Sequence, residues 1–227
     1  MLNKILSLNP CEYKVLNTFS TDLWESHQKE IDEAIFLKTK SGLPFFRDLP
    51  KKSLELASNL FEIMNLETII ECGTGLQGKK SGNSSIFWVN KTNAKKIFCI
   101  DLDQKWIDTV FNKFGDDKRI IFKNADIFDV VPNIQGIDLI YMDFWSKTDV
   151  DREKDYLRLF KICNDFPKMI LIDDTDHKTP WKHTLLIPEL LGNYGYKLLY
   201  IGRQSLLIRG DKAKKYDKEI KELLNSF

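Results

Sequence analysis

Residues 68–85, Thr-Ile-Ile-Glu-Cys-Gly-Thr-Gly-Leu-Gln-Gly-Lys-Lys-Ser-Gly-Asn-Ser-Ser, contain the pattern that decides the fold. The stretch opens with three β-branched residues at 68–70, which suit a packed strand. A glycine-rich segment follows, and glycine accepts positive φ and lets the backbone approach a ligand closely. Ser84 or Ser85 can then cap a helix. We predict a ligand site here, because open α/β sheets bind ligands between the carboxyl end of a strand and the following helix.

The glycine spacing fits more than one ligand. Gly73, Gly75 and Gly78 match the G-x-G-x-x-G pattern of dinucleotide-binding proteins. Glu71 argues against a dinucleotide, because its carboxylate would repel a pyrophosphate. Residues 79–83 argue against it too, because they extend the loop beyond the third glycine. A carboxylate at this position suits a cationic ligand instead. The alternative is that these residues form a tight turn that binds no ligand. The candidate cofactor-binding residues of this turn are Glu71, Gly73, Thr74 and Gly75.

Length and composition describe an ordinary globular chain. The 227 residues are 43% hydrophobic and 30% charged, enough for one domain with a sizeable core. A net charge of +1 offers no bulk attraction to nucleic acid or to an anionic membrane. No apolar run approaches the ~20 residues of a membrane-spanning helix. We predict a single domain over residues 1–227, with an N-terminal helical or lid segment over 1–50 and an α/β core over 51–227.

The cysteines and the N-terminus predict a cytoplasmic protein. Residues 1–10 are too short and too polar a stretch for a signal peptide. The four cysteines, at positions 11, 72, 99 and 163, show no metal-like pairing, so we interpret them as reduced thiols. The sequence leaves homo-oligomerisation open.

Two segments before the core carry apolar patterns. Trp24, Ile31 and their neighbours recur at helical spacing, which predicts a helix over Asp22–Leu37. Gly42 and Pro44 then mark a loop that carries Phe45 and Phe46. These two side chains either form part of a lid over the site or pack onto the core.

Strands alternate with amphipathic helices through the rest of the chain. Helical stripes of apolar residues span positions 57–64, 107–114 and 156–163, and a final stripe runs from Tyr216 to Phe227. This alternation implies a mostly parallel sheet with helices on both faces. Gly202 and Arg203 separate the last two strands without a helix, so these should form an antiparallel hairpin. The seven predicted strands are residues 68–71, 97–101, 119–123, 137–142, 168–173, 196–201 and 204–209.

Acidic residues lie at the carboxyl ends of five of the predicted strands. They are Glu71, Asp101, Asp126, Asp143 and the pair Asp173-Asp174. The carboxyl ends of parallel strands share one edge, where crowded carboxylates repel one another and need cations or hydroxyl donors. Asp101 follows the glycine turn by about 20 residues, a separation that suits hydrogen bonds from ribose hydroxyls. Asp143, Asp173 and Asp174 form a hard-oxygen site that suits Mg²⁺. No arginine is evident among these acids, and Lys147 is the nearby cation. The alternative for Asp173 and Asp174 is that they cap the next loop.

Three segments resemble known methyltransferases. Glu-x-Gly-x-Gly at 71–75 resembles the first motif of class I S-adenosylmethionine-dependent methyltransferases, whose Rossmann-like sheet also has seven strands with an antiparallel last one. Asp-Phe-Trp-Ser-Lys at 143–147 resembles the Asp-His-Trp-Lys of catechol O-methyltransferase. Asp-Asp-Thr at 173–175 resembles the acidic pair of the cephalosporin hydroxylase-like methyltransferases. The resemblance covers about residues 39–209.

The resemblance implies an activity and assigns roles. It implies methyl transfer from S-adenosylmethionine to an oxygen of a small polar acceptor, such as a sugar or a surface-glycan precursor, and not to nucleic acid. Asp126 would lie beside the adenine, and the three aspartates would bind Mg²⁺. Lys147, displaced by one residue from the lysine of the catechol enzymes, or His177 would accept the proton. Trp145 and Trp181 either wall a substrate pocket or pack in the core. An NAD(P)-dependent oxidoreductase and a non-catalytic binding subunit are the rival interpretations.

Overall fold

The computed structural model describes residues 50–75, 84–145, 149–173, 186–200 and 204–226. Several predicted features lie outside these ranges: the helix over Asp22–Leu37, the Phe45/Phe46 loop, Lys147, Asp174, His177 and Trp181.

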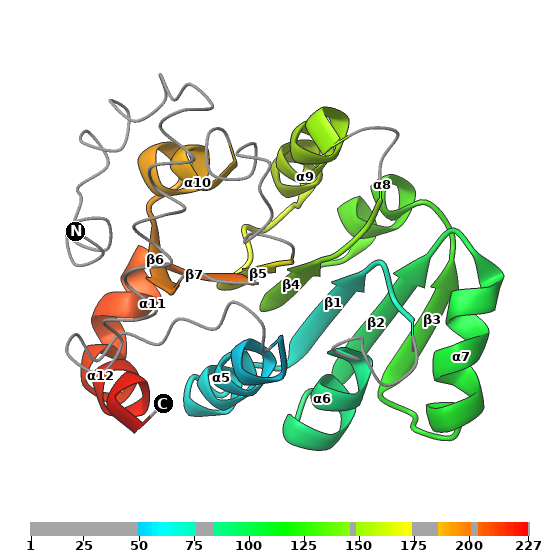
Figure 1. Cartoon of the computed structure of the whole chain (residues 1–227), viewed down its shortest axis with the longest axis horizontal. Helices are drawn as coiled ribbons and strands as arrows, with labels where there is room; N and C mark the ends of the chain where they lie inside the picture. The colour runs from blue at the N-terminus through cyan, green and yellow to red at the C-terminus, as the bar shows by residue number, and fades with distance from the viewer. Residues whose placement is uncertain (1–49, 76–83, 146–148, 174–185, 201–203, 227) are drawn as a thin grey trace.

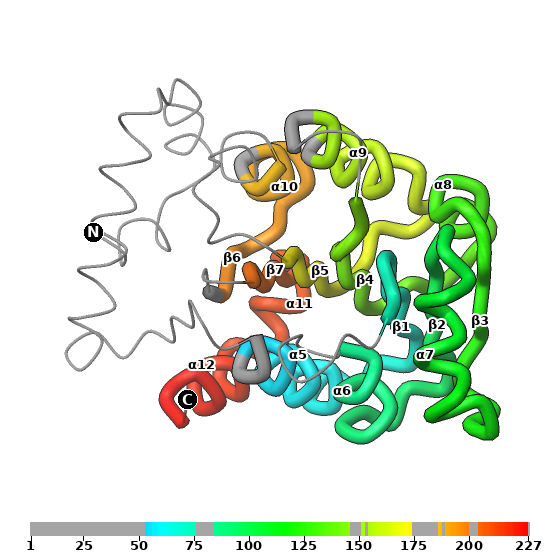
Figure 2. Tube along the Cα trace, turned by 45° about the vertical axis from the view of Figure 1, so that its right-hand side comes forward, coloured from blue at the N-terminus to red at the C-terminus, as the bar shows by residue number. Residues whose placement is uncertain are grey.

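Seven strands form one twisted sheet in the order β3-β2-β1-β4-β5-β7-β6 (Figure 2). β7 runs antiparallel to both of its neighbours, β5 and β6, and the other pairs are parallel. This confirms the predicted α/β fold, with strand bounds that differ from the prediction by no more than two residues. The strands are β1 (Thr68–Cys72), β2 (Lys96–Asp101), β3 (Ile120–Asn124), β4 (Leu139–Met142), β5 (Met169–Ile172), β6 (Tyr196–Tyr200) and β7 (Ser205–Arg209).

Helices cover both faces of the sheet, as predicted (Figure 1). One apolar core joins alternate strand residues to α8, α9 and α10, and the other joins the remaining strand residues to α5, α6, α7, α11 and α12. The central strands are buried on both sides, which explains why they read as continuous apolar runs in the sequence. The helices are α5 (Pro50–Ile63), α6 (Ser84–Lys91), α7 (Gln104–Phe114), α8 (Ile127–Val130), η2 (Val131–Asn133), α9 (Asp149–Ile162), α10 (Ile187–Asn193), α11 (Gly210–Lys215) and α12 (Asp217–Ser226).

Two of the predicted helical stripes differ from the structure. Phe111 belongs to the predicted apolar stripe of α7 yet is 54% exposed, because α7 lies over the edge strand β3, where the Phe111 ring packs edge-on against Phe122. The final stripe was predicted as one helix, but the backbone leaves helical geometry at Tyr216 and divides it into α11 and α12. Both differences arise at the borders of the sheet, where a helix has fewer neighbours to bury its apolar side.

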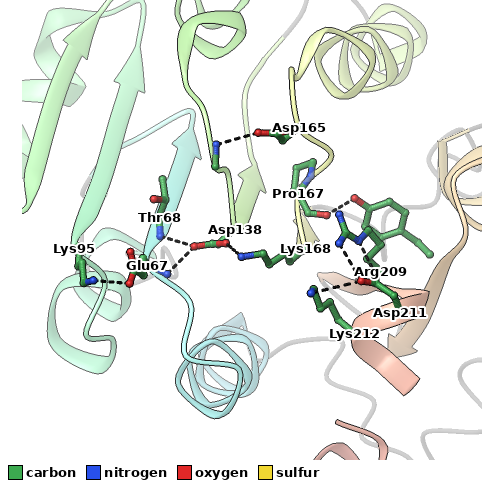
Figure 3. A network of polar contacts seen from close by, with 12 residues as sticks. Glu67, Thr68, Lys95, Asp138, Asp165, Pro167, Lys168, Arg209, Asp211 and Lys212 are labelled. Carbon is green, nitrogen blue, oxygen red and sulfur yellow. Dashed lines mark hydrogen bonds and ion pairs between the residues drawn. The ribbon is translucent and has the colours of Figure 1, made fainter. Parts of the chain in front are cut away.

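A buried carboxylate ties the central strands together at their amino ends (Figure 3). Asp138 precedes β4 and is 4% exposed. Its Oδ2 accepts hydrogen bonds from the backbone N–H groups of Glu67 (2.7 Å), which precedes β1, and Thr68 (3.0 Å), which begins it. Its Oδ1 pairs with the Lys168 ammonium, which precedes β5. One side chain therefore fixes the start of three adjacent strands.

The described cysteines agree with the expectation of reduced thiols. Cys72, Cys99 and Cys163 are buried free thiols. Within the part of the chain that the structure describes, no helix has the length and apolar character that a membrane crossing needs.

Candidate functional site

The glycine turn lies at the point where the strand order of the sheet reverses, between β1 and β4. From β1 the chain goes first to β2 on one side and later to β4 on the other, so the loops after β1 and β4 diverge at the carboxyl edge. Ligands of open α/β sheets bind at such a switch point. Gly73 follows β1 with φ of +84°, and a Cβ there would lie 2.0 Å from the backbone oxygen of Asp143. The turn therefore packs directly against the end of β4, and only glycine fits that contact.

Glu71 is buried behind this turn and holds both ends of its loop. Its carboxylate is 0% exposed and accepts from Thr74 Oγ1 (2.9 Å), Ser85 Oγ (2.6 Å) and the Ser84 hydroxyl. Thr74 precedes residues 76–83, and the two serines follow them. Burial raises the pKa of Glu71, and the hydroxyl hydrogen bonds oppose the rise. Ser84 and Ser85, which the sequence indicated as helix caps, therefore donate their hydroxyl hydrogen bonds to Glu71 at the start of α6.

Asp101 lies at the neighbouring strand end, as predicted. It is half-buried, and its Oδ1 accepts from the backbone N–H of Asp103 at 2.8 Å. Burial raises the pKa of Asp101, and the nearby charge of Asp103 raises it further. Asp103 itself caps α7 by accepting from Lys105 N at 2.9 Å. Leu102, between the two acids, exposes 72% of its surface, so an apolar side chain stands beside the candidate ribose-binding carboxylate.

Gly75 and Asp126 complete the cofactor side of the edge. A Cβ at Gly75 would lie 3.1 Å from the ring of Trp106 on α7, so the turn runs close to that indole. Asp126 caps α8 by accepting from Phe128 N at 2.9 Å. The contact of Asp126 with adenine stays a prediction. The role of Asp126 as the N-cap of α8 was not predicted.

An arginine lies beside the first of the predicted metal ligands. Arg152 on α9 is 2% exposed, and its Nη2 lies 3.6 Å from Asp143 Oδ1. Its guanidinium also stands 4.9 Å from the ring of Trp145, and its Nε donates to Tyr156 Oη at 3.3 Å. The expectation that no arginine joins these acids is therefore wrong. The sequence held one usable signal, since Arg152 is four residues before the buried Tyr156 and so shares its helix face.

Asp173 is held by a glutamine that the sequence analysis missed. Asp173 is 5% exposed, and its Oδ1 accepts from Gln204 Nε2 at 2.7 Å. The same nitrogen donates to Tyr141 Oη at 2.9 Å, and Tyr141 Oη donates to Asp143 Oδ2 at 3.3 Å. Gln204 and Tyr141 therefore bridge the two described aspartates of the predicted metal site.

The described aspartates fit a divalent cation in charge and donor type. Asp143 and Asp173 bring two carboxylates, and a divalent metal prefers such hard oxygen ligands. Arg152 neutralises one charge at most, so the pair keeps a negative balance. Over the described ranges, no group of three or more His, Cys, Asp or Glu side chains is arranged to hold a metal. The third predicted ligand, Asp174, lies outside those ranges, as do Lys147 and His177.

Comparisons with solved structures identify the fold. A methyltransferase from Geobacter sulfurreducens matches with a TM-score of 0.52 and 17% identity, over 79% of this chain and 87% of that one. An O-methyltransferase from Bacillus cereus in complex with SAH matches at 0.50 and 13%, over 79% and 90%. A Corynebacterium glutamicum protein matches at 0.50 and 14%, over 86% and 94%. No protein-family model matches the sequence, and no curated protein shows a significant match. The chain thus has the Rossmann-like fold of class I methyltransferases.

Proposed function

We propose that this protein is an S-adenosylmethionine-dependent O-methyltransferase that uses Mg²⁺ and acts on a small polar acceptor. The observation that carries the proposal is the glycine turn at the switch point, held by the buried Glu71 and flanked by Asp101. The fold shared with the Geobacter sulfurreducens and Bacillus cereus methyltransferases supports it.

The cofactor side follows from the geometry of the turn. Gly73 and Gly75 bring backbone close to the donor, and Asp101 accepts from its ribose hydroxyls. Asp126 accepts from the adenine amine, and Leu102 covers an apolar part of the nucleoside. The bound donor supplies an already activated methyl group, so the protein's work is to align the acceptor oxygen with it and to exclude water.

The acceptor side lies beyond β4 and β5. Asp143 and Asp173, together with Asp174, would hold Mg²⁺, and the bound ion would supply the charge that favours a deprotonated acceptor hydroxyl. Lys147 or His177 takes the proton. Trp145 exposes 78% of its surface beside Asp143 and presents a flat apolar face. Such a face suits the ring of a carbohydrate, which is the acceptor class that we propose.

Calorimetric titration with S-adenosylhomocysteine and NAD⁺ tests the cofactor. We expect low-micromolar affinity for the first and none for the second, and tighter binding of NAD⁺ would favour the oxidoreductase. Asp101→Asn should weaken S-adenosylhomocysteine binding about tenfold, because a charged acceptor is lost. Asp103→Asn is the matched control, since asparagine also caps α7 and should leave the affinity unchanged.

The metal has its own test. Activity should vanish with a chelator and return with Mg²⁺ or Mn²⁺. Asp173→Asn keeps the shape of the side chain and removes one charge, so turnover should fall far more than cofactor affinity. Normal turnover of this variant in the presence of a chelator would remove the metal from the proposal.

A further inference from the structure

Gln204 occupies a buried position between α5 and the carboxyl ends of β4 and β5, all of which are distant from it in sequence. The antiparallel pairing of Ile172 with Ser205 places Gln204 next to Asp173. Gln204 is 1% exposed. Its Oε1 accepts from Ser53 Oγ on α5 at 2.6 Å, while its Nε2 reaches Asp173 and Tyr141. Every polar atom of this amide therefore has a partner.

The direction of each hydrogen bond follows from the chemistry of the partners. An ionised carboxylate only accepts, so the amide nitrogen must face Asp173 and the amide oxygen must face Ser53. Ser53 then has to donate. Tyr141 accepts from Gln204 and donates its proton onward to Asp143. The result is a directed chain from α5 through Gln204 to both aspartates.

Gln204 and Tyr141 are neutral donors, so they orient the two carboxylates without cancelling charge, while Arg152, 3.6 Å from Asp143, offsets part of it. An amide and a phenol each fix the direction of a lone pair, whereas a lysine or arginine in their place would also neutralise a ligand. Groups that orient metal ligands in this way commonly change metal affinity 10- to 100-fold when removed. The same face of the sheet carries Glu71, which is likewise held by hydroxyl donors.

We propose that Gln204 is a positioning residue, which sets the separation and direction of the Asp143 and Asp173 carboxylates so that both bind one divalent cation. Ser53 fixes the amide of Gln204, and Tyr141 passes its orientation to Asp143. The inference rests on the proposed function, because it assigns a supporting group to the metal site of that function. It goes beyond it in naming a residue that does not touch the metal.

Mn²⁺ titration of the full-length protein, followed by electron paramagnetic resonance with S-adenosylhomocysteine present, tests the proposal. Gln204→Met keeps the length and volume of the side chain and removes its hydrogen bonds. We expect it to weaken Mn²⁺ binding 10- to 100-fold, with S-adenosylhomocysteine affinity within about twofold. Ser53→Ala should act in the same direction with a smaller loss.

Ser58→Ala is the matched control. Ser58 lies on the same helix and is 1% exposed, but its hydroxyl bonds to the carbonyl of Leu54 within α5. This variant should bind Mn²⁺ like the wild type. Circular dichroism and S-adenosylhomocysteine binding verify that each variant is folded, and if Gln204→Met does not fold, the difference between the two serine variants decides.

Three outcomes would overturn the proposal. The first is equal Mn²⁺ affinity of the wild type and folded Gln204→Met. The second is an equal effect of Ser53→Ala and Ser58→Ala, which would assign any loss to the packing of α5. The third is a wild type that binds no Mn²⁺, since there would then be no cation to position. S-adenosylhomocysteine binding, measured in the same samples, tests the methyl-donor site independently of the metal site.

Discussion

The two ends of the parallel strands treat buried acids in opposite ways. At the amino ends, Asp138 meets an ammonium group and two backbone N–H groups (Figure 3). At the carboxyl ends, Glu71 meets hydroxyl groups and Asp173 meets the amide of Gln204. The first arrangement offsets the charge of the acid, and the second only orients it. Asp143, also at the carboxyl ends but less buried, differs from Glu71 and Asp173 in having Arg152 3.6 Å away.

The pKa directions show the same contrast. Arg209 lowers the pKa of Asp211, on the amino-end side of the sheet, to about 2 (Figure 3). Burial raises the pKa of Glu71 at the carboxyl end. A paired acid stabilises the fold by being ionised, whereas a buried acid held by neutral donors makes ionisation costly. The contrast is consistent with our proposal that the carboxyl end binds ligands, while the paired acids of the amino end stabilise the fold.

The largest expected loss of stability comes from replacing Gly73 at the carboxyl ends of the strands, and it should exceed the loss from replacing Gly136 at the amino ends. Gly73→Ala combines a positive φ with a Cβ placed 2.0 Å from a backbone oxygen, so we expect a loss of about 3–5 kcal/mol in unfolding free energy. Gly136, before β4, also has positive φ, at +67°, but a Cβ there meets nothing within 4 Å. Gly136→Ala should cost about 1–2 kcal/mol. Urea denaturation measures both, and equal losses would show that the contact with β4 is not what requires glycine at 73.

Asp138→Ala should be next in size. It leaves the N–H groups of Glu67 and Thr68 without their acceptor, at about 1–3 kcal/mol each, so we expect a loss of about 3 kcal/mol. Lys168→Ala removes only the partly exposed cation and should cost about 1 kcal/mol or less. Urea denaturation gives both values, with S-adenosylhomocysteine affinity unchanged. A small loss for Asp138→Ala would remove the structural role assigned to this end.

Glu71→Gln tests the carboxyl end through pH. Because the folded pKa of Glu71 lies above 4.5, the folded state holds a proton that the unfolded state has lost over the window between the two values. The folded state binds more protons there, so wild-type stability from this group falls as pH rises, by up to about 1.4 kcal/mol per pH unit. Glutamine does not titrate, so the variant should lack this slope. Denaturation at several pH values above 4.5 measures the difference, and parallel curves for the two proteins would contradict it.

The smallest effect concerns the exposed apolar residues of each end. Leu102→Ala should change stability by about 0.5 kcal/mol or less, because the side chain is 72% exposed. It should weaken S-adenosylhomocysteine binding about fivefold, since covering this side chain stabilises the complex by about 1 kcal/mol. Phe166, before β5, stacks on Phe160 at 4.9 Å, and Phe166→Ala should cost about 1 kcal/mol of stability without any effect on affinity. If Leu102→Ala lowered stability without changing affinity, and Phe166→Ala weakened S-adenosylhomocysteine binding, the cofactor would bind at the amino ends of the strands instead.

The strands and their order of appearance were accessible to sequence reasoning for a simple reason. Central strands such as β1 and β4 are buried on both faces, so their residues form short apolar runs that end at an acid. The helix stripes of α5 and α9 were equally readable, because each packs one side on the sheet. Phe111 was misjudged because the periodicity of a helix does not tell how far the sheet extends beneath it.

The α/β alternation, the glycine turn and the acids at the strand ends could be read from the amino-acid sequence, because they depend on local patterns of burial and backbone freedom. The donors that those acids receive depend instead on how distant segments pack together. Gln204 reaches Asp173 because β7 inserts beside β5 in antiparallel register, and Arg152 reaches Asp143 because α9 packs over β4. Such partners are set by long-range strand pairing and helix packing. The i, i+4 spacing of Arg152 and Tyr156 indicates a shared helix face, but it does not indicate that this face packs on β4.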